Sequence, residues 1–204
     1  MNSHIKKISD VVVYVKRGIA PAYTEDDDGI IIVNQKCIRD SRCDFSKARR
    51  NDLSRKKISS EKLVQKNDIL INSTGVGTLG RVCQVREVYF PFSVDTHVTI
   101  VRPDPEKIDP IYLGIFLCSV ESQIENLGEG STGQTELYAD VILDLEVQMP
   151  DLDSQGIISR MLGDMDAVIE NKYKEIDSLI ELKKRLTPSI LSGDFDGDPT
   201  KWRW

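Results

Sequence analysis

Residues 154–187 read SQGIISRMLGDMDAVIENKYKEIDSLIELKKRLT, a run of 34 residues without proline. Apolar residues recur in it at alternating spacings of four and three, which is the pattern of a helix that packs along one stripe. This stripe contains Ile158, Leu162, Met165, Ile169, Ile176, Leu179 and Leu186, with Lys172 and Lys183 at the two remaining positions. The pattern predicts a single helix of roughly 50 Å. Such a helix is longer than the domain ahead of it, so we expect it to form a coiled coil with a partner.

The residues ahead of the helix follow a different pattern. Short runs rich in β-branched residues, separated by Gly, Pro, Asn and Asp, predict strands at 11–15, 30–33, 69–71, 81–85, 97–101 and 143–149. Asp109 followed by Pro110 predicts the start of a helix that ends at Gly128, and a shorter helix is expected near 135–140. Because the strands lie too close together for helical crossovers, the sequence predicts an α+β fold with a mixed or antiparallel sheet.

These patterns divide the chain of 204 residues into three parts. We expect a globular domain over 1–150, the long helix over 151–191 and a tail over 192–204. No apolar run approaches the roughly 18 residues of a membrane span, and the first residues lack the apolar core of a signal peptide. The four cysteines form no Cys-x-x-Cys pair and two histidines accompany them, so we expect reduced thiols, no metal site and a cytoplasmic protein without a membrane partner.

Positive charge is concentrated in the first half of the chain. The stretch from Lys36 to Lys66 contains 11 Lys and Arg residues and four Asp and Glu residues, a local charge of +7 in a chain of net charge −6. Such asymmetry indicates a surface that faces a polyanion. Since guanidinium and ammonium groups both bind phosphates, we expect phosphate contacts from Lys47, Arg49, Arg50, Arg55, Lys56 and Lys57.

Polar side chains in the turns are candidates for reading the base edges of a nucleic acid. Amides, hydroxyls and guanidinium groups match the donors and acceptors that base pairs present in the grooves of DNA. Seven such residues lie in predicted turns or beside them, namely Asn34, Gln35, Thr74, Thr78, Arg81, Thr132 and Gln134.

Two glycine-rich segments resemble nucleotide-binding motifs, but each lacks a feature that such a motif requires. GVGTLG at 75–80 matches G-x-G-x-x-G, but a predicted strand follows it where a dinucleotide fold needs a helix, so we expect a hairpin. GEGSTGQT at 128–135 approaches a phosphate-binding loop, but Gln134 stands where the lysine is required. No other arrangement supports catalysis, so the sequence predicts a binding protein with no catalytic residues, no metal and no cofactor of its own.

Four segments resemble the specificity (S) subunits of type I restriction-modification systems. PDLDSQGII at 150–158 resembles the P-x-L-x-x-Q-x-x-I opening of that family's long helix, and residues 182–194 resemble its closing L-K-K-x-L … L-L-S-G-E. QKNDILI at 65–71 resembles a strand of the target recognition domain, and the turn at 130–133 resembles its end. Family members usually carry two recognition domains and two long helices, so this chain, with one of each, resembles a half-size form.

The resemblance implies a function and a set of partners. It implies a subunit that recognises an interrupted sequence in double-stranded DNA and acts as a homodimer with methyltransferase (M) and restriction (R) subunits. S-adenosylmethionine, ATP and Mg²⁺ would then belong to those partner subunits. The residues alone leave two alternative functions open. The chain could be a coiled-coil adaptor that does not bind DNA, or it could be a stand-alone nuclease.

Overall fold

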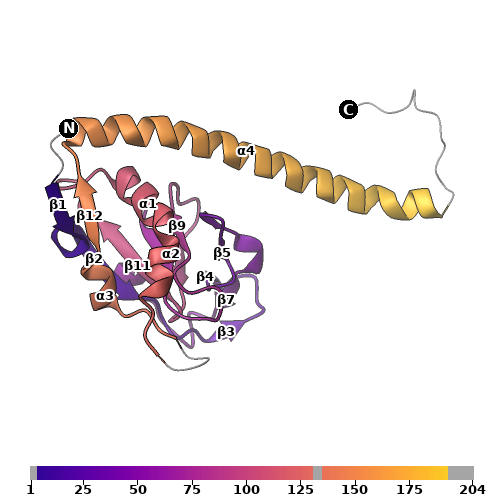
Figure 1. Cartoon of the computed structure of the whole chain (residues 1–204). Helices are drawn as coiled ribbons and strands as arrows, with labels where there is room; N and C mark the ends of the chain where they lie inside the picture. Colours follow the sequence, from indigo (N-terminus) through magenta and orange to yellow (C-terminus); the bar gives the residue numbers. More distant parts are fainter. Residues whose placement is uncertain (1–3, 131–134, 193–204) are drawn as a thin grey trace. The chain divides into compact units, whose positions relative to one another are not determined.

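The computed structural model describes residues 4–130 and 135–192, and the chain forms two compact units, residues 1–160 and 161–204. The centre of the first unit is an antiparallel sheet in which the strands follow the order β2-β11-β8-β9 (Figure 1). These strands span Val12–Arg17 (β2), Val98–Pro103 (β11), Ile69–Asn72 (β8) and Val82–Gln84 (β9). The pairing of β8 with β9 confirms that the glycine-rich segment at 75–80 connects a hairpin.

A second sheet follows the order β10-β4-β7-β3, with β10 and β4 parallel and the other neighbours antiparallel. Its strands span Phe92–Val94 (β10), Ile30–Val33 (β4), Arg49–Asn51 (β7) and Tyr23–Thr24 (β3). Two ribbons complete the strands, β1 (His4–Lys7) with β12 (Glu146–Met149), and β5 (Ile38–Arg39) with β6 (Arg42–Cys43). The expected mixed and antiparallel pairing is therefore confirmed.

The central sheet is buried on both faces. Ile69 and Ile71 of β8 pack into one apolar cluster with residues of the helices, whereas Leu70 between them packs into a second cluster with residues of β4 and β10. All three side chains are fully buried. Because successive side chains of a strand point to opposite faces, a strand covered on both sides is apolar throughout, which explains the uninterrupted run at 69–71.

The predicted helix after Asp109 is divided in two. Asp109 caps α1 (Pro110–Ser119) by accepting hydrogen bonds from the backbone nitrogens of Ile111 and Tyr112, as expected. The chain then turns at Val120, and α2 spans Glu121–Asn126. The Glu121 carboxylate accepts a hydrogen bond of 2.7 Å from the backbone nitrogen of Val82, at the first residue of β9. This contact to a strand distant in sequence accompanies the break, which helical periodicity does not reveal.

The third helix, α3, spans Ala139–Leu143 and begins later than the expected helix near 135–140. Glu136 forms isolated bridges with Thr74 and Glu129, so the backbone ahead of α3 is extended. Single turns of 3-10 helix occur at Ile8–Asp10, Phe45–Lys47 and Ser60–Lys62.

The long helix, α4, spans Leu152–Leu191, so it extends beyond the proline-free run at 154–187 and contains Pro188 in its last turn. Asp151 caps its start by accepting hydrogen bonds from Ser154. Gln155, 1% exposed, accepts from the backbone nitrogen of Asp109 and donates to the carbonyl of Pro150. The hydroxyl of Ser159 donates to the Asp109 carboxylate. The first two turns of α4 are thus hydrogen-bonded to the cap of α1 within the first unit.

Candidate nucleic-acid interface

Three turns meet where strands of the two sheets end. The parallel strands β4 and β10 end side by side, and the backbone nitrogen of Asp95 donates to the carbonyl of Val33. The end of β8 lies beside the start of β11, and the backbone nitrogen of Ser73 donates to the carbonyl of His97. We call residues 34–37, 73–81 and 95–97 together the turn cluster. It collects most of the base-reading candidates on one part of the domain.

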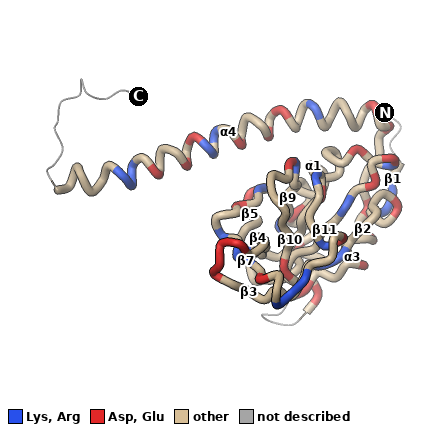
Figure 2. Tube along the Cα trace, turned by 180° about the vertical axis from the view of Figure 1, so that it is seen from behind, with Lys and Arg blue, Asp and Glu red and all other residues tan. Residues whose placement is uncertain are grey.

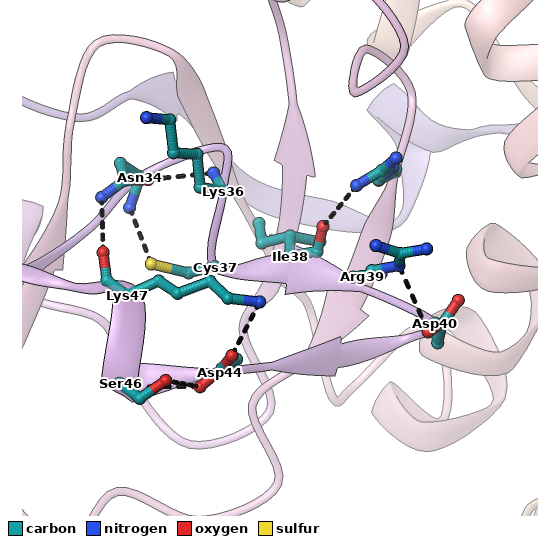
Figure 3. Close-up of polar contacts among 10 residues, drawn as sticks. Asn34, Lys36, Cys37, Ile38, Arg39, Asp40, Asp44, Ser46 and Lys47 are labelled. Carbon is teal, nitrogen blue, oxygen red and sulfur yellow. Dashed lines mark hydrogen bonds and ion pairs between the residues drawn. The ribbon is translucent and has the colours of Figure 1, made fainter.

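Buried amides hold these turns together. The side chain of Asn34, which is 8% exposed, donates to the Lys47 carbonyl and accepts from the backbone nitrogen of Lys36 (Figure 3). The side chain of Asn72 donates to the carbonyls of Gln35 and Thr78, each at 3.0 Å. Asn34 therefore stabilises a turn with both of its polar groups, which removes it from the set of residues available to bases.

The accessible polar groups of the turn cluster form a short chain. The hydroxyl of Thr74 lies 2.6 Å from Nδ1 of the exposed His97, and the hydroxyl of Thr78 donates to the carbonyl of Thr74. Asp95 accepts from the backbone nitrogen of His97 and from the hydroxyl of Tyr23. Burial is the main cause that raises the pKa of Asp95, and burial together with Asp95 raises the pKa of Tyr23 to about 12. His97 and Tyr23 were not among the candidates from the sequence, since neither carries a motif.

The basic residues expected to bind phosphates do not lie on one continuous loop, because part of this segment is the strand β7. Arg49 and Arg50 lie on β7, so their side chains point to opposite faces of the second sheet. The guanidinium of Arg49 lies 3.6 Å from the centre of the Tyr23 ring, whereas Arg50 donates to the carbonyl of Gly29 at 2.7 Å. The two arginines therefore cannot bind one phosphate surface together. Arg49 is the exposed one of the pair.

The other basic candidates lie before and after β7. Lys47 is exposed and forms an ion pair of 3.0 Å with Asp44. Arg55, Lys56 and Lys57 are exposed in the turn that follows β7. Asp52 shapes this turn by accepting hydrogen bonds from Ser54, and these bonds lower the pKa of the Asp52 carboxyl.

Arg81, a base-reading candidate, is half-buried and already hydrogen-bonded. Its guanidinium donates to the carbonyl of Gly77 at 2.7 Å and to that of Ile38 at 3.5 Å. It thus connects the glycine-rich turn to β5. Gln35, Thr74 and Thr78 are half-exposed, while Thr132 and Gln134 lie outside the described residues.

An acidic loop interrupts the positive surface. Residues 25–28, EDDD, connect β3 to β4 and appear as a red loop beside β7 in Figure 2. Because β3 and β4 are both neighbours of β7, these carboxylates repel a phosphate backbone that approaches Arg50. A phosphate backbone would therefore meet less repulsion at the turn Arg55–Lys57 than at Arg50.

The helix beyond residue 160 presents a second candidate surface. Leu162, Met165, Ile169, Ile176 and Leu179 are all exposed along the predicted stripe of α4, and Ile158 and Leu186 are half-buried. Monomeric proteins rarely expose an apolar surface of this length, which makes the stripe a candidate surface for a partner.

Two further observations concern the described residues, 4–130 and 135–192. No group of three or more His, Cys, Asp and Glu side chains among them is arranged to hold a metal ion. None of their helices has the length and apolar character that crossing a membrane demands.

Comparison with known proteins places this architecture among DNA specificity proteins. The family model described as type I restriction modification DNA specificity domain matches residues 2–181. A putative type I restriction enzyme MjaX specificity subunit from Methanocaldococcus jannaschii is 21% identical over 192 residues, which cover 92% of this chain and 45% of the relative. The type I restriction enzyme EcoBI specificity subunit from Escherichia coli is 27% identical over 196 residues, covering 91% and 39%.

Solved structures of similar fold agree with this result. The S subunit of a type I restriction-modification system from M. genitalium superimposes with a TM-score of 0.66 at 19% identity, over 98% of this chain and 47% of that one. The HsdS subunit from Thermoanaerobacter tengcongensis gives a TM-score of 0.56 at 16% identity, over 96% and 45%. The chain thus spans less than half the length of the relatives that it matches.

Proposed function

Because the chain belongs to the family of type I restriction modification DNA specificity domains, we propose that it selects the DNA sequence on which a type I restriction-modification complex acts. The observation that carries the proposal is the turn cluster, in which accessible hydroxyl, amide and imidazole groups from three turns lie together beside exposed lysines and arginines. Such a surface matches the two requirements of sequence-specific binding, phosphate contacts that position the protein and polar groups that read base edges.

The proposal assigns no catalytic step to this chain. Methyl transfer from S-adenosylmethionine and ATP- and Mg²⁺-dependent cleavage belong, in this proposal, to the methyltransferase and restriction subunits that the chain directs to its site. In this proposal the protein acts in the cytoplasm, where it has access to DNA. Within the interface we assign base reading to Gln35, Thr74 and Thr78, and phosphate binding to Arg49, Lys47 and the turn Arg55–Lys57.

We further propose that two copies associate through the apolar stripe of α4 as an antiparallel pair. A two-fold axis across the helices would place one recognition domain at each end, and a symmetric dimer reads an interrupted inverted repeat. Both domains would meet the same face of the duplex if the two half-sites were about 10 base pairs apart, centre to centre. Antiparallel pairing also brings the basic residues 183–185 of one helix toward Asp164 and Asp166 of the other.

The first test is selection of bound sequences from a library of randomised DNA duplexes, performed with the full purified chain. We expect enrichment of a defined motif and no cleavage of the duplexes when Mg²⁺ is added. A coiled-coil adaptor would enrich no motif and would bind no duplex. A nuclease would cut in the presence of Mg²⁺, and either result would overturn the proposal.

The second test concerns the phosphate contacts of Arg55, Lys56 and Lys57. We expect their joint replacement by glutamine to flatten the plot of log affinity against log salt concentration by about one unit for each lost contact. Replacement of Lys6, Lys7 and Lys107 removes the same charge from other parts of the domain and should leave the slope nearly unchanged. Equal slopes for the wild type and the first variant would exclude this turn from the interface.

A further inference from the structure

A short ribbon of β5 and β6 follows the first turn of the turn cluster, residues 34–37. Ile38 pairs with Cys43 and Arg39 with Arg42, so that Asp40 and Ser41 alone form the connecting loop. Both loop residues have positive φ, 52° and 57°, as a type I′ hairpin turn requires. Figure 3 shows Arg39 and Asp40 at the end of the ribbon, away from its base at Cys37.

The base of this ribbon is anchored in the core. Cys37 and Ile38 are fully buried, and Cys43 packs against the same apolar cluster as β9 and β10. Arg81 donates to the carbonyl of Ile38 and to that of Gly77, so the ribbon is fixed beside the glycine-rich turn of the turn cluster. The tip is therefore held at a defined place relative to Thr74 and Thr78.

The tip itself combines two arginines with a turn of uncommon backbone conformation. Arg39 and Arg42 are directly opposed across the ribbon, which places both side chains on the same face of the tip. The side chain of Arg39 is 68% exposed, and Ser41 occupies a left-handed backbone conformation that residues other than glycine seldom adopt. An exposed guanidinium held beside a turn of this conformation is well placed to contact a ligand.

The charges at the tip favour contact with base edges over contact with phosphates. Asp40 lies beside Arg39, with Oδ2 of its carboxylate 3.5 Å from Nε of the guanidinium, and its side chain is 66% exposed. A carboxylate at this place repels phosphates but accepts a hydrogen bond from the amino group of cytosine. The arginine fork in turn donates two parallel hydrogen bonds to O6 and N7 of guanine.

We propose that the β5–β6 ribbon enters the major groove and that Arg39 and Arg42 read guanine, with Asp40 contributing to recognition of a G·C pair. The major groove is wide enough to admit a two-stranded ribbon, and it displays the guanine edge in full. This inference rests on the proposed function and deepens it, because it assigns specificity to residues that the sequence motifs do not single out.

The test compares the full wild-type chain with Arg39→Lys and Arg42→Lys in selection from randomised DNA duplexes. Lysine keeps the charge but loses the fork, so each variant should lose the preference for guanine at one position of the motif by about 5- to 150-fold and keep the salt dependence of binding. Arg160→Lys, an exposed position on the helix, serves as the control and should enrich the wild-type motif. Thermal unfolding followed by circular dichroism verifies that all variants are folded.

The possible results distinguish a failure of this inference from a failure of the proposed function. If the wild type enriches a motif and both variants enrich the same motif with the same strength, the ribbon does not read bases and the inference is wrong. Equal weakening of binding to all duplexes would place the arginines on phosphates and would also overturn it. If the wild-type chain enriches no motif, the proposed function fails and the inference falls with it.

Discussion

Replacement of Asp68 by alanine is expected to lower the free energy of unfolding by about 3–5 kcal/mol, because it leaves a largely buried guanidinium without its partner. Asp68 is fully buried, and Arg102 has a side-chain exposure of 15%. Two hydrogen bonds join them, from Nε of Arg102 at 2.8 Å and from Nη2 at 2.7 Å. Asp68 raises the pKa of Arg102, so the guanidinium remains charged when the chain folds.

The carboxylate also shapes the local backbone. Its Oδ2 accepts a hydrogen bond of 2.7 Å from the backbone nitrogen of Gln65, at the turn that leads into β8. Burial raises the pKa of Asp68 against the opposing effect of these hydrogen bonds. Loss of the side chain therefore removes both the carboxylate partner of Arg102 and the acceptor of the Gln65 backbone nitrogen.

Denaturant titration of the wild type and of Asp68→Ala measures this effect. Lys66→Ala removes the exposed ion pair between Lys66 and Glu87 near the same strand and should cost less than about 1 kcal/mol, as surface pairs usually do. If Asp68→Ala and Lys66→Ala destabilise the protein equally, the buried pair is not the structural support that its geometry indicates.

The second large effect is expected for the joint change of Leu162, Ile169 and Leu179 to glutamate, which should convert the proposed dimer into a folded monomer. Burial of a leucine-sized side chain contributes about 1.5–3 kcal/mol, so three losses in each helix exceed about 5 kcal/mol. This corresponds to a weakening of association by a factor of about 10³ or more. The globular unit does not depend on these residues and should remain folded.

Light scattering measures the oligomeric state, and sequencing of methylated sites in a host with the methyltransferase subunit measures function. We expect the variant to be monomeric and to support no site-specific methylation. Ala167→Glu, Asn171→Glu and Ser178→Glu add the same charge to other faces of the helix and should leave the dimer intact. The dimer proposal is wrong if the wild type is monomeric both alone and with the methyltransferase, or if the methylated site has two unrelated halves.

The helix and the main strands could be predicted because their signals are local. The apolar stripe of α4 repeats from Ile158 to Leu186, and no strand pattern occurs in the same residues. The run at 69–71 and the pattern at 30–33 likewise correspond to β8 and β4. The family resemblance rests on the same segments, since the two ends of the helix carry its most specific motifs.

The candidate interface was predicted less well, since sequence proximity does not determine which groups remain free. Asn34 and Arg81 belong to polar residue types that bind DNA, but the backbone carbonyls of Lys47, Gly77 and Ile38 already accept hydrogen bonds from them. Arg49 and Arg50 are adjacent in the chain, but the strand sends them to opposite faces.

The long helix, its apolar stripe and the concentration of positive charge follow from local sequence, because periodicity and composition are properties of neighbouring residues. Tertiary contacts determined the turn cluster, the break at Val120 and the attachment of the β5–β6 ribbon to Arg81. Each of these depends on hydrogen bonds or burial between segments far apart in the chain, such as the bond from Val82 to Glu121. Such long-range contacts form only when the sheets assemble, and no local pattern records them.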